Sequence, residues 1–182
     1  MRRIAAAIVL VGFAFAFFTL PFAGVDILID AVGFLLVWNG VRALQKKDAV
    51  YRFAAPCSLV LVAIAAAQVF LGGGVAAYAV QSGLAGWVLQ GLRLAAEGLL
   101  YWQLLAGFAR LAKAGQRPGL AKLAYVALAV CLAGVLVSAC AWALLFFGYP
   151  LVVPVAAVVW AGHIALLAVL AGFVFWFGTQ PE

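Results

Sequence analysis

Charged residues are scarce in this chain of 182 residues. Asp, Glu, Lys and Arg together make up 9% of the sequence, whereas apolar residues make up 70% and the mean hydropathy is +1.25. A soluble domain needs about 25% charged residues to cover its surface, so the composition excludes a water-soluble protein. It indicates an integral membrane protein of about six helices at roughly 20 residues per crossing. The few residues outside the apolar runs leave no room for a soluble domain, and we expect a single transmembrane domain over 1–182.

Metal ligands and catalytic motifs are also scarce. The single histidine excludes haem ligation by two histidines of the chain and a His-rich metal site. Cys57, Cys131 and Cys140 form no C-x-x-C pair, and we expect them to be reduced, buried thiols. No G-x-S-x-G, H-E-x-x-H or phosphate loop is present. We therefore expect no enzyme, no catalytic residue, no metal and no cofactor.

Prolines and glycines divide the apolar sequence into segments. The breaks predict helices over 4–20, 25–44, 53–71, 91–112, 120–147 and 152–177. The segment 75–90 is ambiguous, because it fits an interfacial segment, a re-entrant segment or an extension of the following helix. A signal peptide is the rival interpretation of the first helix, but the residues around Ala16 and Pro21 fit a cleavage site poorly. We interpret Arg2 and Arg3 as a cytoplasmic anchor.

The net charge of +6 comes from cations that occur in short loop clusters. This distribution favours membrane topology and anionic lipid at the cytoplasmic face over a nucleic-acid partner. With both termini in the cytoplasm, ten of the eleven Lys and Arg fall at or beyond cytoplasmic helix ends, and the exception is Arg93. We expect a polytopic, all-α protein of the cytoplasmic (inner) membrane with six transmembrane helices. The sequence leaves open whether it forms a homo-oligomer or joins a partner membrane subunit.

Four charged residues lie inside the predicted helices. Asp26 and Asp30 are four residues apart in one helix and Arg93 and Glu97 in another, a spacing that places each pair on one face. Asp30 lies 12 residues before the cytoplasmic end of its helix at Arg42, about 18 Å at the helical rise. Glu97 lies 13 residues before the corresponding Arg110, about 19.5 Å by the same rise.

The matching depth makes Arg93 the candidate to neutralise Asp30 or Asp26. Glu97 is then either paired with Arg93 or protonated, because charges buried in a membrane require such compensation. His163, near the middle of the last helix, fits a proton relay or a neutral side chain bonded to a neighbouring helix.

Two functional interpretations follow from these charges. The first is an outward-facing polar site between the helices 25–44 and 91–112 that binds or transports a small solute or an ion. Its candidate binding residues are Asp26, Asp30, Gln90, Arg93, Glu97, Tyr101 and His163. The alternative is a non-catalytic accessory or scaffold subunit in which the charges form a structural latch. The first interpretation requires a cavity that reaches Asp30, and the second does not.

The segment that begins at Asp26 resembles a known signature. Asp26-Ile-Leu-Ile-Asp30, followed by Gly33 and Phe34, is similar to the D-I-L-P-D-x-I-G-[YW] motif of uncharacterised small integral membrane proteins of Gram-positive bacteria. This chain departs from the motif with Ile29 in place of proline. The resemblance covers about 4–52 and implies the fold and a role for the two aspartates and the glycine, without an activity.

A weaker, architectural likeness is to the substrate-binding subunits of energy-coupling-factor transporters. Those subunits also have six helices in a chain of this length and dock through small residues of their first helix. Gly12 and Ala16 are the small residues that the likeness implies for this role here.

Overall fold

The chain folds into a bundle of α-helices. The computed structural model describes residues 2–17, 26–46, 48–70, 84–146 and 152–179. Within these ranges it is helical without strands, which confirms the predicted all-α class. The helices are α1 (Arg2–Phe17), α2 (Asp26–Gln45), the short 3₁₀ helix η1 (Ala49–Tyr51), α3 (Ala54–Phe70), α5 (Leu84–Ala114), α6 (Pro118–Phe146) and α7 (Val152–Gly178).

The helix α5 is longer than the sequence predicts. It begins at Leu84 and runs for 31 residues, whereas the predicted helix covers 91–112. The part 84–90 of the ambiguous segment is therefore an extension of the following helix. Residues 71–83, which include the rest of that segment, lie outside the described residues.

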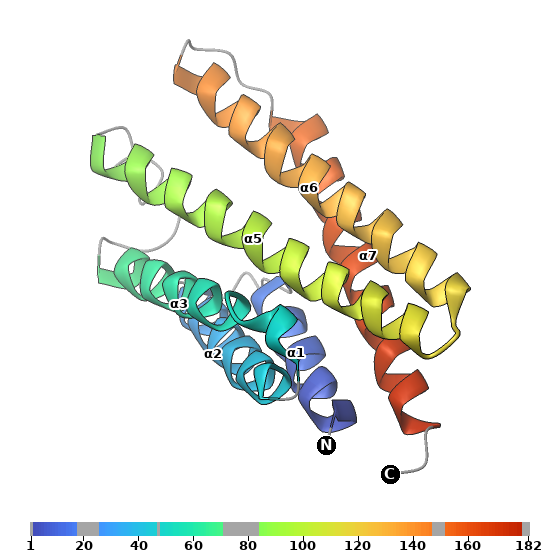
Figure 1. Ribbon diagram of the computed structural model, residues 1–182. Helices are drawn as coiled ribbons and strands as arrows, with labels where there is room; N and C mark the ends of the chain where they lie inside the picture. Colours follow the sequence, from blue (N-terminus) through green and yellow to red (C-terminus); the bar gives the residue numbers. More distant parts are fainter. Residues whose placement is uncertain (1, 18–25, 47, 71–83, 147–151, 180–182) are drawn as a thin grey trace.

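The helices form a closed ring in which neighbours in sequence are neighbours in space. Each helix packs against the one before it and the one after it, and α7 packs back against α1 (Figure 1). The first turn of α1, the last turn of α7 and the connections from α2 to α3 and from α5 to α6 lie at the same end of the bundle. We call this the basic end, because it carries Arg2, Arg3, Lys46, Arg52, Lys113 and Arg117.

The core of the ring comes from apolar residues spaced three or four apart on each helix. Leu100, Leu104 and Phe108 of α5 are fully buried, as are Leu166 and Leu170 of α7. A spacing of four places such side chains on one face of a helix. Further buried positions are Val9 and Phe13 of α1, Val37 and Val41 of α2, and Ala121, Ala124 and Ala127 of α6. These five helices, and α3 through Leu61, each direct one face into a common core.

The helices α1 and α2 cross at glycines. A Cβ atom placed on Gly33 would lie 2.6 Å from the backbone N of Ala16 and 2.7 Å from the carbonyl O of Gly12. Gly40 is similarly close to the Ala5 carbonyl O, at 2.8 Å. Small residues permit such backbone contact, the usual way in which membrane helices associate closely. Gly12 and Ala16, the docking residues implied by the transporter likeness, therefore pack inside the bundle against α2.

The connection between α2 and α3 is held to α5. The carboxylate of Asp48 accepts a hydrogen bond from the Val50 N–H at 3.0 Å and caps η1. Tyr51 follows with 1% of its surface exposed, and its ring lies 5.9 Å from that of Phe108. Gly107 makes room for Tyr51, because a Cβ there would lie 2.5 Å from the tyrosine ring.

Three of the described helical segments are long and apolar enough to cross a membrane. They are Ala49–Ala67, Pro118–Leu144 and Ala157–Phe177. Their outward faces carry large apolar side chains, of which Val126, Leu136 and Ile164 are each at least 60% exposed. Such extensive apolar surface is rare on soluble proteins and typical of membrane or partner contact. The structure is therefore consistent with a membrane protein, as the composition predicts.

Candidate functional site

Three of the four charged residues inside the predicted helices lie near one another in the described structure. Asp30 of α2 and Arg93 of α5 line a narrow crevice, whose other walls are Phe34 of α2 and residues of α3. Arg93 is within electrostatic range of both Asp30 and Glu97. We call Asp30, Arg93 and Glu97 the charge cluster.

The helix α3 contributes to this crevice, which the sequence comparison of two helices did not predict. Leu61, Ile64 and Ala65 of α3 line the crevice as apolar walls, together with Asp30 and Arg93. The crevice has about 0 Å³ of room for a water-sized sphere. As described, it therefore accommodates neither a solute nor a water molecule, and the charges contact protein.

Arg93 and Glu97 form an ion pair on one face of α5. Arg93 Nε donates a hydrogen bond of 2.9 Å to Glu97 Oε1, so Glu97 is paired with Arg93, one of the two predicted arrangements. The side chain of Glu97 is 14% exposed and that of Arg93 33% exposed, so the carboxylate points inward. Removing one partner from a buried pair leaves an uncompensated charge and is strongly destabilising.

Tyr101 lies one turn beyond Glu97, in the core. Only 2% of its surface is exposed, and its ring lies 6.1 Å from that of Phe13. Within the described part of the chain its hydroxyl has no hydrogen-bond partner. A buried hydroxyl without a partner costs about 1–3 kcal/mol. Among the candidate binding residues whose side chains are described, Tyr101 is thus the one with an unsatisfied polar atom next to the charge cluster.

His163 is held by aromatic contacts from two helices. Its ring stacks on that of Phe17, the last residue of α1, with centroids 3.7 Å apart and planes at 6°. Trp160 approaches it edge-on at 6.2 Å. The imidazole therefore joins α7 to α1 by stacking, an arrangement that neither sequence interpretation of His163 anticipated.

For two further candidate residues the structure gives only the position in the helix or the exposure. Gln90 is half-buried on α5, three residues before Arg93. Asp26 is the first residue of α2, and its side chain lies outside the described structure.

Two polar contacts between helices were not predicted as pairs. The Oε1 atom of Gln103 in α5 accepts a hydrogen bond of 3.0 Å from the N–H of Phe53, just before α3. The Cys131 thiol of α6 donates to the Gly162 carbonyl of α7 at 3.3 Å. Of the three free cysteines, Cys131 is buried, Cys57 is half-buried and Cys140 is exposed. The prediction that all three are buried is therefore confirmed for Cys131, met only in part for Cys57 and wrong for Cys140.

The described residues hold no group of three His, Cys, Asp or Glu side chains that could bind a metal ion. Fold and crevice together define a helical bundle, consistent with a membrane protein, in which charged residues of two helices line one crevice with apolar residues of a third. Comparison with protein-family models, curated proteins and solved structures finds no match for the chain. Its function is therefore argued from its own residues.

Proposed function

We propose that the chain is a multi-pass protein of the cytoplasmic membrane, with six crossings and both termini in the cytoplasm. The closed ring of helices and the cations gathered at the basic end support this topology. C-terminal fusions test it, since green fluorescent protein folds in the cytoplasm and alkaline phosphatase is active outside it. We expect a fluorescent, phosphatase-negative result, and an active phosphatase fusion would refute the topology.

Within this bundle, the charge cluster acts as a structural latch between helices. The observation that carries this proposal is the crevice between Asp30 and Arg93, which is walled by α3 and has no room for water. A charge inside a membrane helix is costly unless a partner compensates it. Arg93 supplies that compensation for Asp30 of α2 and for Glu97 of its own helix.

A latch of this kind fixes which faces of α2, α3 and α5 meet. Nearly uniform apolar helices slide and rotate against one another at little cost, whereas a charged pair is satisfied in only one register. The protein is then a non-catalytic accessory or scaffold subunit that presents its outer surface to the bilayer, to a second copy or to a partner membrane protein.

The substitution Asp30→Asn tests the latch. We expect it to lower the free energy of unfolding in detergent by roughly 1–3 kcal/mol, below the value for fully buried pairs because Arg93 is partly exposed. Asp48→Asn is the matched control, because an asparagine oxygen still accepts the bond from the Val50 N–H. Equal stability of the two variants would contradict the latch.

Binding or transport of a small solute or ion at the same place is the second candidate function. The observation that favours it is the Tyr101 hydroxyl, which is buried beside the charge cluster and has no hydrogen-bond partner in the described structure. Such an atom would be satisfied by a ligand that enters when the helices separate. This function requires α3 and α5 to part, because the crevice is closed.

Thermal unfolding in the presence of sodium, potassium, phosphate or single amino acids separates the two candidates. Solute binding predicts that at least one of them raises the melting temperature of the wild type but not of Tyr101→Phe. The latch predicts no such difference, and equal or greater stability for Tyr101→Phe, because that variant removes an unsatisfied hydroxyl.

The segment 26–34 resembles the Gram-positive signature, and we propose that the chain is related to the proteins that carry it. Two residues of that signature have a place in the structure. Asp30 belongs to the charge cluster, and Gly33 lies at the crossing of α1 with α2. The signature would then describe how the second helix packs against its neighbours.

A further inference from the structure

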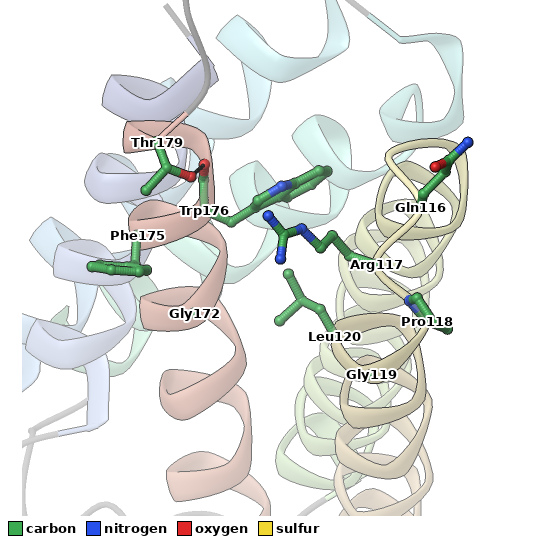
Figure 2. Close-up of a pocket in the computed structure, with 9 residues that line it drawn as sticks. All are labelled: Gln116, Arg117, Pro118, Gly119, Leu120, Gly172, Phe175, Trp176 and Thr179. Atoms are coloured by element: carbon green, nitrogen blue, oxygen red, sulfur yellow. Dashed lines mark hydrogen bonds between the residues drawn. The ribbon is translucent and has the colours of Figure 1, made fainter.

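A groove separate from the charge cluster lies at the basic end, between the start of α6 and the end of α7. Its volume is about 610 Å³, within the roughly 300–1,000 Å³ of small-molecule sites. Figure 2 shows Arg117 and Leu120 on one side and Trp176 of α7 pointing toward them, and Phe175 and Thr179 of α7 also line the groove. The two walls come from segments about 55 residues apart in the chain.

Most of the groove surface is apolar. A Cβ atom on Gly172 would lie 3.3 Å from Leu120 Cδ1, so the missing side chain at Gly172 leaves the hollow beneath Leu120. Trp176 is 8% exposed and forms the inner wall, whereas Phe175 is 76% exposed at the outer surface. Because α6 and α7 are both apolar enough to cross a membrane, the groove opens toward lipid in a membrane-embedded bundle.

One cation stands at the polar end of this groove. The backbone of Arg117 is fixed on both sides, since its N–H donates to the Ala112 carbonyl at 2.8 Å and its carbonyl accepts from the Ala121 N–H at 3.1 Å. Its guanidinium extends from the start of α6 toward Trp176 (Figure 2). Among the described residues that line the groove there is no Asp or Glu, so the charge that they contribute is positive.

We propose that this groove binds one anionic phospholipid, with the phosphate on Arg117 and an acyl chain against Leu120, Gly172 and Phe175. A guanidinium binds phosphate oxygens through two parallel hydrogen bonds. Basic pockets between helices at the cytoplasmic side of membrane proteins suit such headgroups. The apolar wall suits the acyl chain of a phospholipid, and Arg117 suits its phosphate. The inference depends on the membrane location of the chain and not on the role of the charge cluster.

A second groove provides an internal comparison. It has a volume of about 400 Å³ on the outer face of α1 and α2, and it combines Arg3 with apolar residues such as Ile4, Val11 and Leu36. Its charge and apolar character resemble those of the larger groove, but it is smaller. Arg3→Gln is therefore a control for the general attraction of anionic lipid to a basic helix end.

Native mass spectrometry of the full-length protein in neutral detergent tests the proposal. Phosphatidylglycerol is titrated against phosphatidylcholine and against inorganic phosphate. We expect one tightly bound phosphatidylglycerol, with phosphatidylcholine bound at least about fivefold more weakly and inorganic phosphate failing to displace it. Displacement by inorganic phosphate would mean that the headgroup alone is recognised, and it would overturn the lipid assignment.

Two substitutions separate the two parts of the groove. Arg117→Gln, at an exposed position, should weaken phosphatidylglycerol binding by about tenfold, the loss of one charged hydrogen-bonding group. Gly172→Phe should fill the hollow and weaken both lipids. Arg3→Gln and Lys122→Gln should stay within about twofold of the wild type, since each removes only a general attraction. Unchanged phosphatidylglycerol binding in Arg117→Gln would refute the site, and so would an equal loss of binding in Arg3→Gln. If Gly172→Phe does not fold, Arg117→Gln alone decides the question.

Discussion

The crossing of α1 and α2 predicts a large effect from a very small substitution. In Gly33→Ala the new methyl group would lie 2.6 Å from the backbone N of Ala16 and 2.7 Å from the carbonyl O of Gly12. Both neighbours are backbone atoms, so relief requires a shift of one whole helix. Such overpacking costs about 1–3 kcal/mol, whereas alanine gains about 0.5–1 kcal/mol over glycine inside a helix. The overpacking term is larger, and we expect a net loss of about 1–2 kcal/mol in the free energy of unfolding.

Reversible unfolding in mixed detergent micelles, followed by far-ultraviolet circular dichroism, measures this loss. Gly91→Ala is the matched control, because a Cβ atom at Gly91 on α5 meets nothing within 4 Å. It should stabilise the protein by about 0.5–1 kcal/mol through helix propensity alone. If Gly33→Ala were as stable as Gly91→Ala, the close backbone contact between α1 and α2 would be refuted.

Three further substitutions test individual contacts by the same unfolding measurement. Gly107→Ala should lose about 1–3 kcal/mol, because its methyl group would lie 2.5 Å from the Tyr51 ring, and a neutral result would contradict that packing. Tyr51→Phe should leave the free energy of unfolding unchanged or raise it, because the buried Tyr51 hydroxyl has no hydrogen-bond partner in the described structure. A marked loss of stability would contradict the absence of such a bond. Gln103→Leu should lose about 1 kcal/mol, since it removes the acceptor of the Phe53 N–H, and Gln103→Glu, which keeps an acceptor oxygen, should recover most of it.

Sequence reasoning was most successful where it depended on the regular geometry of a helix. A rise of 1.5 Å per residue, counted from Arg42 and Arg110, predicted that Asp30 and Glu97 lie at one depth and made Arg93 the candidate partner of Asp30, and Asp30 and Arg93 do line one crevice. This result needs only the helix axis and the face of each residue.

The position of a further helix beside the two that were compared could not be derived in this way. Nothing in the sequence of α3 marks Leu61 or Ile64 as walls of the crevice, because α3 is apolar on every face. The exposure of Cys140 has the same cause, since α6 lacks a polar face that would show which side packs inward. The groove at Arg117 joins two helix ends that are far apart in the chain, and only the closed ring brings them together.

The start of α5 selects one of the alternatives that the sequence left open. The predicted helix began at residue 91, after an ambiguous segment that contains Gly86 and Gln90, and α5 begins at Leu84. Glycine costs only about 1 kcal/mol inside a helix, and the continuing apolar residues around these two positions outweigh that cost.

A double-mutant cycle of Asp30→Asn and Arg93→Gln tests the latch most directly. The free energy of unfolding is measured for the wild type, both single variants and the double variant in the same micelles. The latch predicts that each single variant is destabilised and that the double variant loses less than the sum, with a coupling energy of about 1–2 kcal/mol. Additive losses would contradict the latch, because they would mean that Asp30 and Arg93 do not stabilise one another across the crevice.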